Sequence, residues 1–86
     1  MEQTLEQVDV LLRRKFPNAT TELEFSPDSS KVTGLLIWDG FEGEEQLERQ
    51  KRLWKVIRAH LTPGQRQHVS AIFTVTPTEL AVMREG

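Results

Sequence analysis

The chain has 86 residues and a formal net charge of −2 at pH 7, with 37% hydrophobic residues, 28% charged residues and no cysteine. This composition predicts one small globular domain over residues 1–86. The lack of cysteine excludes disulfides and thiolate chemistry, and the acidic balance argues against indiscriminate binding to nucleic acid. No apolar run approaches the ~20 residues that span a bilayer, and the start of the chain is unlike a signal peptide. We therefore expect a cytoplasmic protein without a membrane contact.

The first third of the chain predicts a helix followed by a hairpin. Apolar residues recur at helical spacing over Thr4–Lys15, and Pro17 disfavours α geometry at the residue before it. Apolar and polar residues alternate over Ala19–Phe25, which predicts a half-buried strand. A second, more central strand is predicted over Val32–Trp38 because it is denser in apolar residues. The polar turn Ser26–Ser30 joins the two strands as an antiparallel hairpin.

The central stretch Gly40–Leu61 predicts a turn and then a long amphipathic helix. Acidic residues come first and basic residues follow, in the order that complements a helix dipole. Its apolar stripe consists of Leu47, Leu53, Trp54, Ile57 and Leu61. Thr62–Gln65 then has capping-box spacing with proline in the first helical position, which predicts a brief helical turn.

The last third predicts a strand and a closing helix. Over Val69–Val75 the apolar side of the strand is expected to hold Val69, Ala71, Phe73 and Val75. Thr76–Glu79 repeats the capping-box spacing, so a short helix is expected to run through about Arg84. The predicted order is α-β-β-α-β-α. It gives an α+β fold with a three-stranded mixed sheet and helices packed on it.

Residues for catalysis are scarce. His60 and His68 are the only histidines, and neither has a carboxylate at metal-ligand spacing. The serines lack any nucleophile-elbow motif. We therefore expect no enzymatic activity. His68 precedes the third strand beside a polar turn, where a histidine is more often structural or merely exposed than a ligand.

A nucleic-acid site is one possible use of the central helix. Gly40 and Gly43 frame a Gly-x-x-Gly turn of the type that clamps a nucleic-acid backbone in KH-like domains. Glu42, Glu44 and Glu45 would repel a phosphate there, so the alternative is a plain strand-to-helix turn with Phe41 in the core. The basic residues that would add phosphate contacts are Arg49, Lys51, Arg52, Lys55 and Arg58.

Several loose motifs, taken in order, resemble the BolA family. They are Phe41-x-Gly43, Leu47-x-Arg49, the aromatic-bearing helix to Leu61, His68 before a β run, and Thr74-x-Thr76-x-x-Glu79. The resemblance implies the KH-like α-β-β-α-β-α plan. It also implies a non-enzymatic protein that binds monothiol glutaredoxins and can share a [2Fe–2S] cluster with them, with His68 at the position of a cluster ligand. Some members of the family act as DNA-binding regulators.

The chain departs from the family pattern at three places. The second cluster ligand, a His or Cys in the loop between the first two strands, is absent from Ser26–Lys31. The typical Arg-His-Arg run is Arg49-Gln50-Lys51, and the tryptophan after the final glutamate is Leu80. The chain therefore resembles a diverged member of the family.

Two hypotheses follow from the residues and the resemblance. The first is an accessory or regulatory protein of iron–sulfur or redox homeostasis, with no cofactor of its own, that docks on a monothiol glutaredoxin-type partner through His68. The alternative is a KH-like nucleic-acid-binding regulator that uses Gly40, Gly43 and the basic helix face. A third possibility is binding to an unrelated protein. The chain itself is expected to be a monomer or a weak homodimer.

Overall fold

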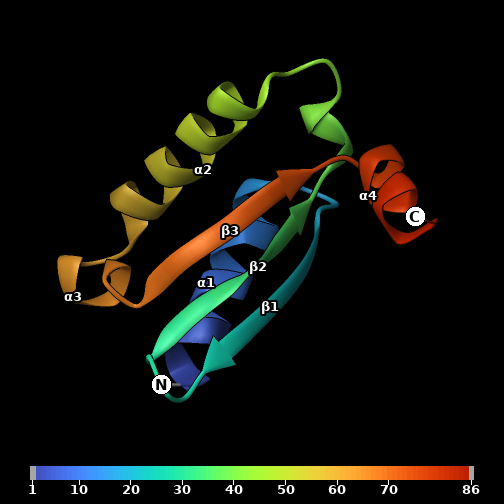
Figure 1. The fold of residues 1–86 in the computed structure, drawn as a ribbon. Coiled ribbons are helices and arrows are strands. Elements are labelled where there is room, and N and C mark those ends of the chain that lie inside the picture. Colours follow the sequence, from blue (N-terminus) through green and yellow to red (C-terminus); the bar gives the residue numbers. More distant parts are fainter. Residues whose placement is uncertain (1, 86) are drawn as a thin grey trace.

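The computed structural model describes residues 2–85, with side chains from Thr4 to Glu85 (Figure 1). The element order confirms the predicted α+β class and adds a short 3₁₀ helix that the sequence did not predict. The elements are α1 (Glu2–Lys15), β1 (Thr20–Ser26), β2 (Lys31–Ile37), η1 (Asp39–Phe41), α2 (Gln46–His60), α3 (Pro63–Arg66), β3 (Val69–Val75) and α4 (Pro77–Glu85).

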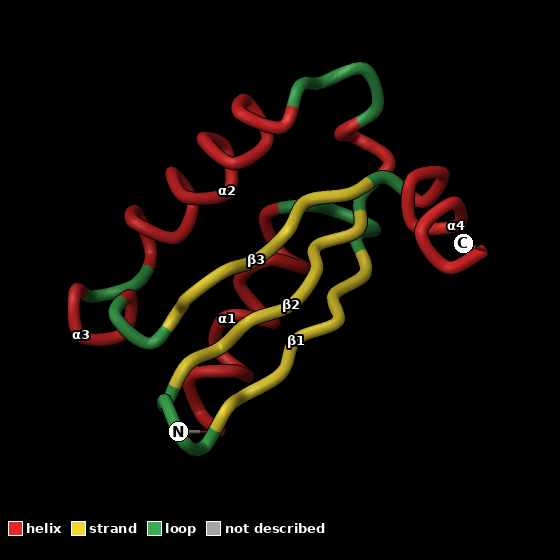
Figure 2. The backbone as a smooth tube through the Cα atoms, viewed as in Figure 1, coloured by secondary structure: helices red, strands yellow, loops and turns green. Residues whose placement is uncertain are grey.

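The three strands form one mixed sheet, as predicted, and the structure gives their order as β1-β2-β3 (Figure 2). β1 and β2 are antiparallel, with register from Thr20↔Ile37 to Ser26↔Lys31. β2 and β3 are parallel, and the long connection through α2 supplies the crossover that a parallel pair needs. The register shifts between Val32 and Thr33, so β3 carries a bulge near its start.

α1 and α2 bury their apolar stripes on one face of the sheet, and α4 lies at the end where β3 stops (Figure 1). The opposite face of the sheet is largely bare. The core is formed by Val8, Leu12 and Phe16 of α1, Leu53, Ile57 and Leu61 at α2, Leu36, Val69 and Ile72 of the sheet, and Phe41. No helix among residues 2–85 is long and apolar enough to cross a membrane.

Capping boxes were predicted at three helix starts, and the structure contains two of them. Thr62 and Gln65 form a reciprocal capping box, with hydrogen bonds of 2.8 and 3.2 Å. Thr76 and Glu79 do the same at 2.9 and 3.1 Å. α1, in contrast, begins at Glu2, so Thr4 lies within the helix and does not precede it.

Two expectations about buried faces are wrong. Phe73 is 63% exposed, while Ile72 and Thr74 are buried at 2% and 1%. The bulge is the reason: it changes the alternation of β3, so Val69 and Ile72 both reach the core. Leu47 is 64% exposed although it belongs to the predicted stripe of α2. It lies about 60° around the helix from Gln50, on the side away from the core residue Leu53.

Candidate functional site

His68 lies between α3 and β3 and is fixed by its own backbone. Its N–H donates to the Gln65 carbonyl at 3.1 Å, and its carbonyl accepts from the Val32 N–H at 2.7 Å. The second bond attaches His68 to the start of β2. His68 as a residue is half-buried, so the sheet fixes its backbone while part of the residue stays accessible to solvent.

The His68 ring contacts the hairpin loop that precedes β2. Nδ1 lies 3.0 Å from the carbonyl oxygen of Ser30, which has a left-handed φ of 55°. Because a carbonyl can only accept, Nδ1 carries the hydrogen in this contact. In the neutral ring Nε2 then holds the lone pair. Histidines that bind metals commonly donate their other nitrogen to a backbone carbonyl in this way.

A second contact closes the same corner. Lys31 Nζ donates to the Gln67 carbonyl, so the hairpin loop and the segment before β3 are joined twice. We call this surface the His68 corner and define it by Ser30, Lys31, Gln67 and His68. It brings together residues that are 38 positions apart in the chain.

The donors at the His68 corner do not fit a [2Fe–2S] cluster held by two ligands from this chain. His68 supplies one imidazole nitrogen, and Ser26–Lys31 supplies only hydroxyl, carboxylate and ammonium groups. Oxygen donors are harder than the thiolates and imidazoles that bind such irons. Within the described part of the chain, no three His, Cys, Asp or Glu side chains are grouped to hold a metal ion.

Arg49, expected on the basic face, is 5% exposed and belongs to the interior. Its guanidinium donates to the Glu44 carbonyl at 2.7 Å and the Thr74 carbonyl at 3.3 Å, and it lies 5.7 Å from the centre of the Phe41 ring. Two further bonds, of 2.6 and 3.1 Å, reach the carboxylate of Glu79. Arg49 is therefore already satisfied and is not available to a phosphate.

The Arg49–Glu79 contact changes the pKa of both groups. The hydrogen bond from Arg49, followed by the bond from the Thr76 backbone, lowers the pKa of Glu79 to about 2. The hydrogen bond to Glu79 raises the pKa of Arg49 above its ordinary value, although burial opposes the rise. Both groups are thus charged at neutral pH.

The other basic residues of α2 are mixed with carboxylates. Arg52 pairs with Glu44 at 2.7 Å and lies 5.9 Å from the Trp38 ring, while Lys51 pairs with Glu48 at 3.6 Å. A shallow hollow on this side of the helix is lined by Glu44, Glu48, Lys51, Arg52 and Lys55. A phosphate chain laid here would meet two carboxylates along with the three cations.

The Gly40–Gly43 turn is occupied by its own contacts. The N–H groups of Phe41, Glu42 and Glu44 donate to the carbonyls of Trp38, Asp39 and Phe41 at 3.2, 3.0 and 3.0 Å, so these donors already have acceptors. Phe41 is fully buried, which confirms the alternative prediction of a structural turn. A Cβ at Gly40 would lie 2.5 Å from the Trp38 ring, and Gly43 has a φ of +79°. Both glycines therefore serve the turn itself.

The sequence reasoning missed three parts of these sites. It did not predict that Ser30 would contact His68, because that contact depends on the parallel strands β2 and β3 beginning side by side. It did not pair Arg49 with Glu79, which are 30 positions apart. It also overlooked Gln50, whose amide reaches the free edge of β3. The departure from Arg-His-Arg at Arg49-Gln50-Lys51 was the one signal that marked this residue.

Comparison with solved structures identifies the fold. No protein-family model and no curated protein matches the chain by sequence. BolA1 from Arabidopsis thaliana is similar with a TM-score of 0.71 and 20% identity, over 92% of this chain and 98% of that one. A BolA protein homologue from Coxiella burnetii gives 0.70 and 16%, over 88% and 94%. A Bol-like protein from Babesia bovis gives 0.59 and 18%, over 92% and 91%. The chain therefore has the BolA-like fold.

Proposed function

We propose that the chain is a non-enzymatic, BolA-like accessory protein that docks on a monothiol glutaredoxin-type protein through the His68 corner. Its role would lie in the regulation of iron–sulfur or redox homeostasis. The observation that carries the proposal is the bond from His68 Nδ1 to the Ser30 carbonyl, which orients the ring and leaves Nε2 as an acceptor. The BolA-like fold supports the choice of partner class.

The corner suits a polar protein contact. His68 offers a nitrogen acceptor on a rigid backbone, and Lys31 places a cation beside it. Because the loop supplies no soft donor, the docking is proposed to be independent of cluster sharing. The binding energy would come from hydrogen bonds and ion pairs of this chain with the partner's surface.

Isothermal titration with a cluster-free monothiol glutaredoxin tests the docking. We expect wild-type binding and a loss of about tenfold or more in affinity for His68→Ala, because a buried polar contact loses its partner. His60→Ala is the matched control, since His60 is exposed at the end of α2, and it should bind as the wild type does. Equal affinity for wild type and His68→Ala, or no wild-type binding, would refute the proposal.

A second titration tests the cluster-independent part. Under anaerobic conditions, the wild-type chain is added to a [2Fe–2S]-loaded monothiol glutaredoxin, and visible absorption and circular dichroism are recorded. We expect unchanged cluster bands with the cluster intact. A spectral change that disappears with His68→Ala would mean that the chain coordinates iron despite lacking a loop ligand, and this part of the proposal would be wrong.

A further inference from the structure

β1 is the open edge of the sheet. It pairs only with β2, and Figure 2 shows it as the outermost strand, with α1 behind the sheet. The opposite edge, along β3, is occupied by α2, because Gln50 and Gln46 donate to the Ile72 and Thr74 carbonyls at 3.0 and 2.9 Å. A further strand that joins this sheet therefore has its place next to β1.

The hydrogen bonds of β2 show which way each residue of the sheet points its backbone groups. The Val32 N–H donates to the His68 carbonyl at 2.7 Å. Beyond the other end of β2, the Trp38 N–H donates to the Val75 carbonyl at 2.9 Å. Backbone groups alternate in direction along a strand, so the even-numbered residues of β2 face β3 and the odd-numbered residues face β1.

The register leaves three residues of β1 with backbone groups that point outward. The odd-numbered Leu35 of β2 lies opposite Glu22, so the even-numbered residues of β1 pair with β2. Thr21, Leu23 and Phe25 consequently point their N–H and carbonyl groups away from the sheet, and these groups have no partner in the described part of the chain. All three residues are half-buried. An unpaired row of this kind is a template for another strand.

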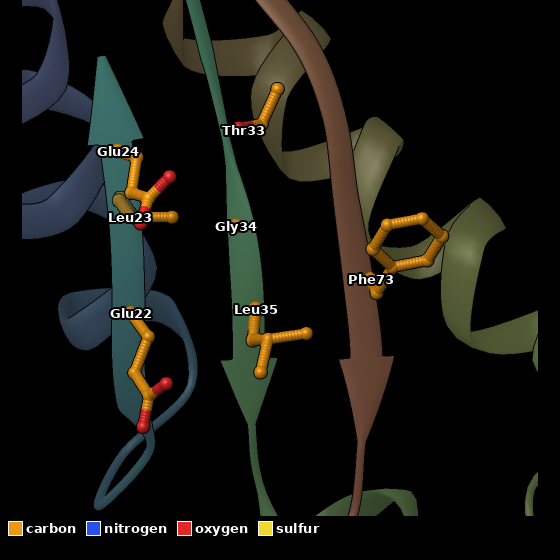
Figure 3. Close-up of a pocket in the computed structure, with 7 residues that line it drawn as sticks. All are labelled: Glu22, Leu23, Glu24, Thr33, Gly34, Leu35 and Phe73. Carbon is orange, nitrogen blue, oxygen red and sulfur yellow. The ribbon is translucent and has the colours of Figure 1, made fainter. Parts of the chain in front are cut away.

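Two carboxylates of β1 border this edge on the bare face of the sheet. Glu22 and Glu24 are exposed there and line a shallow hollow of about 430 Å³ (Figure 3). Glu22 is bonded to Arg84, with one N–O distance of 2.6 Å, whereas Glu24 makes no ion pair among residues 4–85. Lys31, at the hairpin end of β2, donates to the Gln67 carbonyl on the β3 side, away from this edge.

Two further carboxylates border the edge on the helix side. Asp9 of α1 accepts from the Thr21 hydroxyl and from Arg13, the latter at 3.1 Å. Glu6, one turn earlier, lines a hollow together with Phe25 and has no ion pair among the described side chains. Four carboxylates thus stand against two arginines, and the edge of β1 is acidic.

We propose that the outer edge of β1 binds an extended, basic segment of another polypeptide, which joins the sheet as a fourth strand. Its backbone pairs with Thr21, Leu23 and Phe25 in the antiparallel orientation, which is slightly more stable per residue than the parallel one. Residues opposite these three point to the helix side and are apolar, while residues opposite Glu22 and Glu24 are arginine or lysine. This proposal goes beyond docking at the His68 corner, shares no residue with that corner and stands without it.

The charge pattern disfavours a second copy of the chain as the occupant. A copy that paired all three outward residues would place Leu23 opposite its own counterpart, so Glu22 would lie opposite the Glu24 of the other copy, twice in the pair. Like charges directly opposite one another destabilise a strand pair. The same carboxylates repel phosphates, so the edge favours a basic peptide over a nucleic acid as well.

The test uses an acetylated and amidated octapeptide that alternates arginine and valine. Amide hydrogen exchange by NMR should show new protection at Thr21, Leu23 and Phe25, because their N–H groups gain acceptors. The amides of Glu22 and Glu24 already face β2 and should change little. Protection that rises at every second residue distinguishes strand addition from attraction between charges alone.

Two charge reversals separate a local effect of charge from a general one. Glu24→Lys should lower the affinity about tenfold, because a cation then faces the cations of the peptide. Glu45→Lys is the matched control, because it changes the net charge equally at an exposed residue at the start of α2. Its affinity should stay within about twofold of the wild type, since charges that lie apart on the surface are screened by salt.

Methylated peptides test the backbone pairing. The valine nitrogens of the bound peptide face β1, so their methylation should abolish binding. The arginine nitrogens face away from β1, so a peptide methylated there is the control and should still bind.

Four results would overturn the proposal. One is the absence of alternating protection along β1 with the peptide at millimolar concentration. Equal affinities of the two methylated peptides would exclude strand addition, and equal losses in Glu24→Lys and Glu45→Lys would reduce the binding to general charge attraction. The last is protection of Thr21, Leu23 and Phe25 in the free chain that rises with its concentration. That result would assign the edge to a second copy.

Discussion

Arg49 and Glu79 form a two-bond ion pair that joins α2 to α4, with N–O distances of 2.6 and 3.1 Å. The same guanidinium binds the carbonyls of Glu44 and Thr74. α4 has no buried side chain of its own, so this pair and the contact of Arg84 with Glu22 hold it against the sheet. Three residues of the motifs that resemble the BolA family, Arg49, Thr74 and Glu79, therefore meet in one structural contact.

Replacing Glu79 should destabilise the fold. Glu79→Gln leaves the Arg49 guanidinium, which is 6% exposed at its side chain, without its counter-charge. Breaking a buried pair costs about 3–5 kcal/mol, and we expect about 2 kcal/mol here because the Glu79 side chain is 43% exposed. Urea unfolding followed by tryptophan fluorescence measures the change. Glu48→Gln, in an exposed pair, is the control and should stay within about 0.5 kcal/mol. Equal effects of the two variants would contradict this account.

The Glu79 carboxylate makes the stability of the fold depend on pH in the acidic range. The pKa of Glu79 is about 2 in the folded chain against 4.5 for the free group, so the folded state favours the ionised form. Its contribution is present above pH 4.5 and is lost as the pH falls toward 2. Solvent screening reduces it to about 1–2 kcal/mol. The stability difference between wild type and Glu79→Gln should therefore shrink from neutral pH to about pH 3. A constant difference across this range would show that the pKa is not lowered.

Replacing two leucines of α2 by alanine should change the stability of the fold by very different amounts. Leu53 is fully buried, and Leu53→Ala should cost about 2–4 kcal/mol through lost packing and a cavity. Leu47 is 64% exposed, so Leu47→Ala should change stability by less than about 0.5 kcal/mol. Thermal unfolding of both variants under one condition makes the comparison. A large loss of stability in Leu47→Ala would mean that Leu47 belongs to the buried face of α2, as the sequence predicted.

Gly34 should not accept a side chain. Its φ is +153°, and a Cβ there would overlap the Glu22 carbonyl oxygen and lie 2.8 Å from the Cα of Leu23. Gly34→Ala should therefore cost about 3 kcal/mol, since β1 would have to move away from β2. Gly64→Ala is the control, because the nearest atom, Thr62 Oγ1, is 3.9 Å away, and it should be nearly neutral. Chemical denaturation of the two variants separates the outcomes.

The neutral form of His68 should carry its hydrogen on Nδ1. The Ser30 carbonyl, 3.0 Å away, accepts from that nitrogen and favours this tautomer. Long-range ¹⁵N–¹H NMR spectra of the neutral ring distinguish the two tautomers by their nitrogen shifts. His60, exposed at the end of α2, serves as the internal reference. A His68 ring with its hydrogen on Nε2 would remove the basis for the proposed docking.

The sequence alone determined the order and type of the main elements. Helical spacing identified α1 and α2, and alternation identified β1 and β3, because burying one face of an element leaves a periodic pattern in the chain. The density of apolar residues identified β2. Thr62–Gln65 and Thr76–Glu79 marked two helix starts, since a capping box involves only neighbouring residues. The ordered motifs indicated the BolA-like fold, which the solved structures confirm.

Only the tertiary structure decided which residues face solvent and which meet. The bulge in β3 turned Phe73 outward and Ile72 inward, and such an extra residue depends on pairing with β2. The sequence pattern placed Arg49 among the surface cations of α2. In the structure Arg49 is paired with Glu79 of α4. His68 contacts Ser30 because the parallel strands β2 and β3 begin side by side. Each of these contacts joins distant parts of the chain, and periodicity along one element contains no information about its neighbours in space.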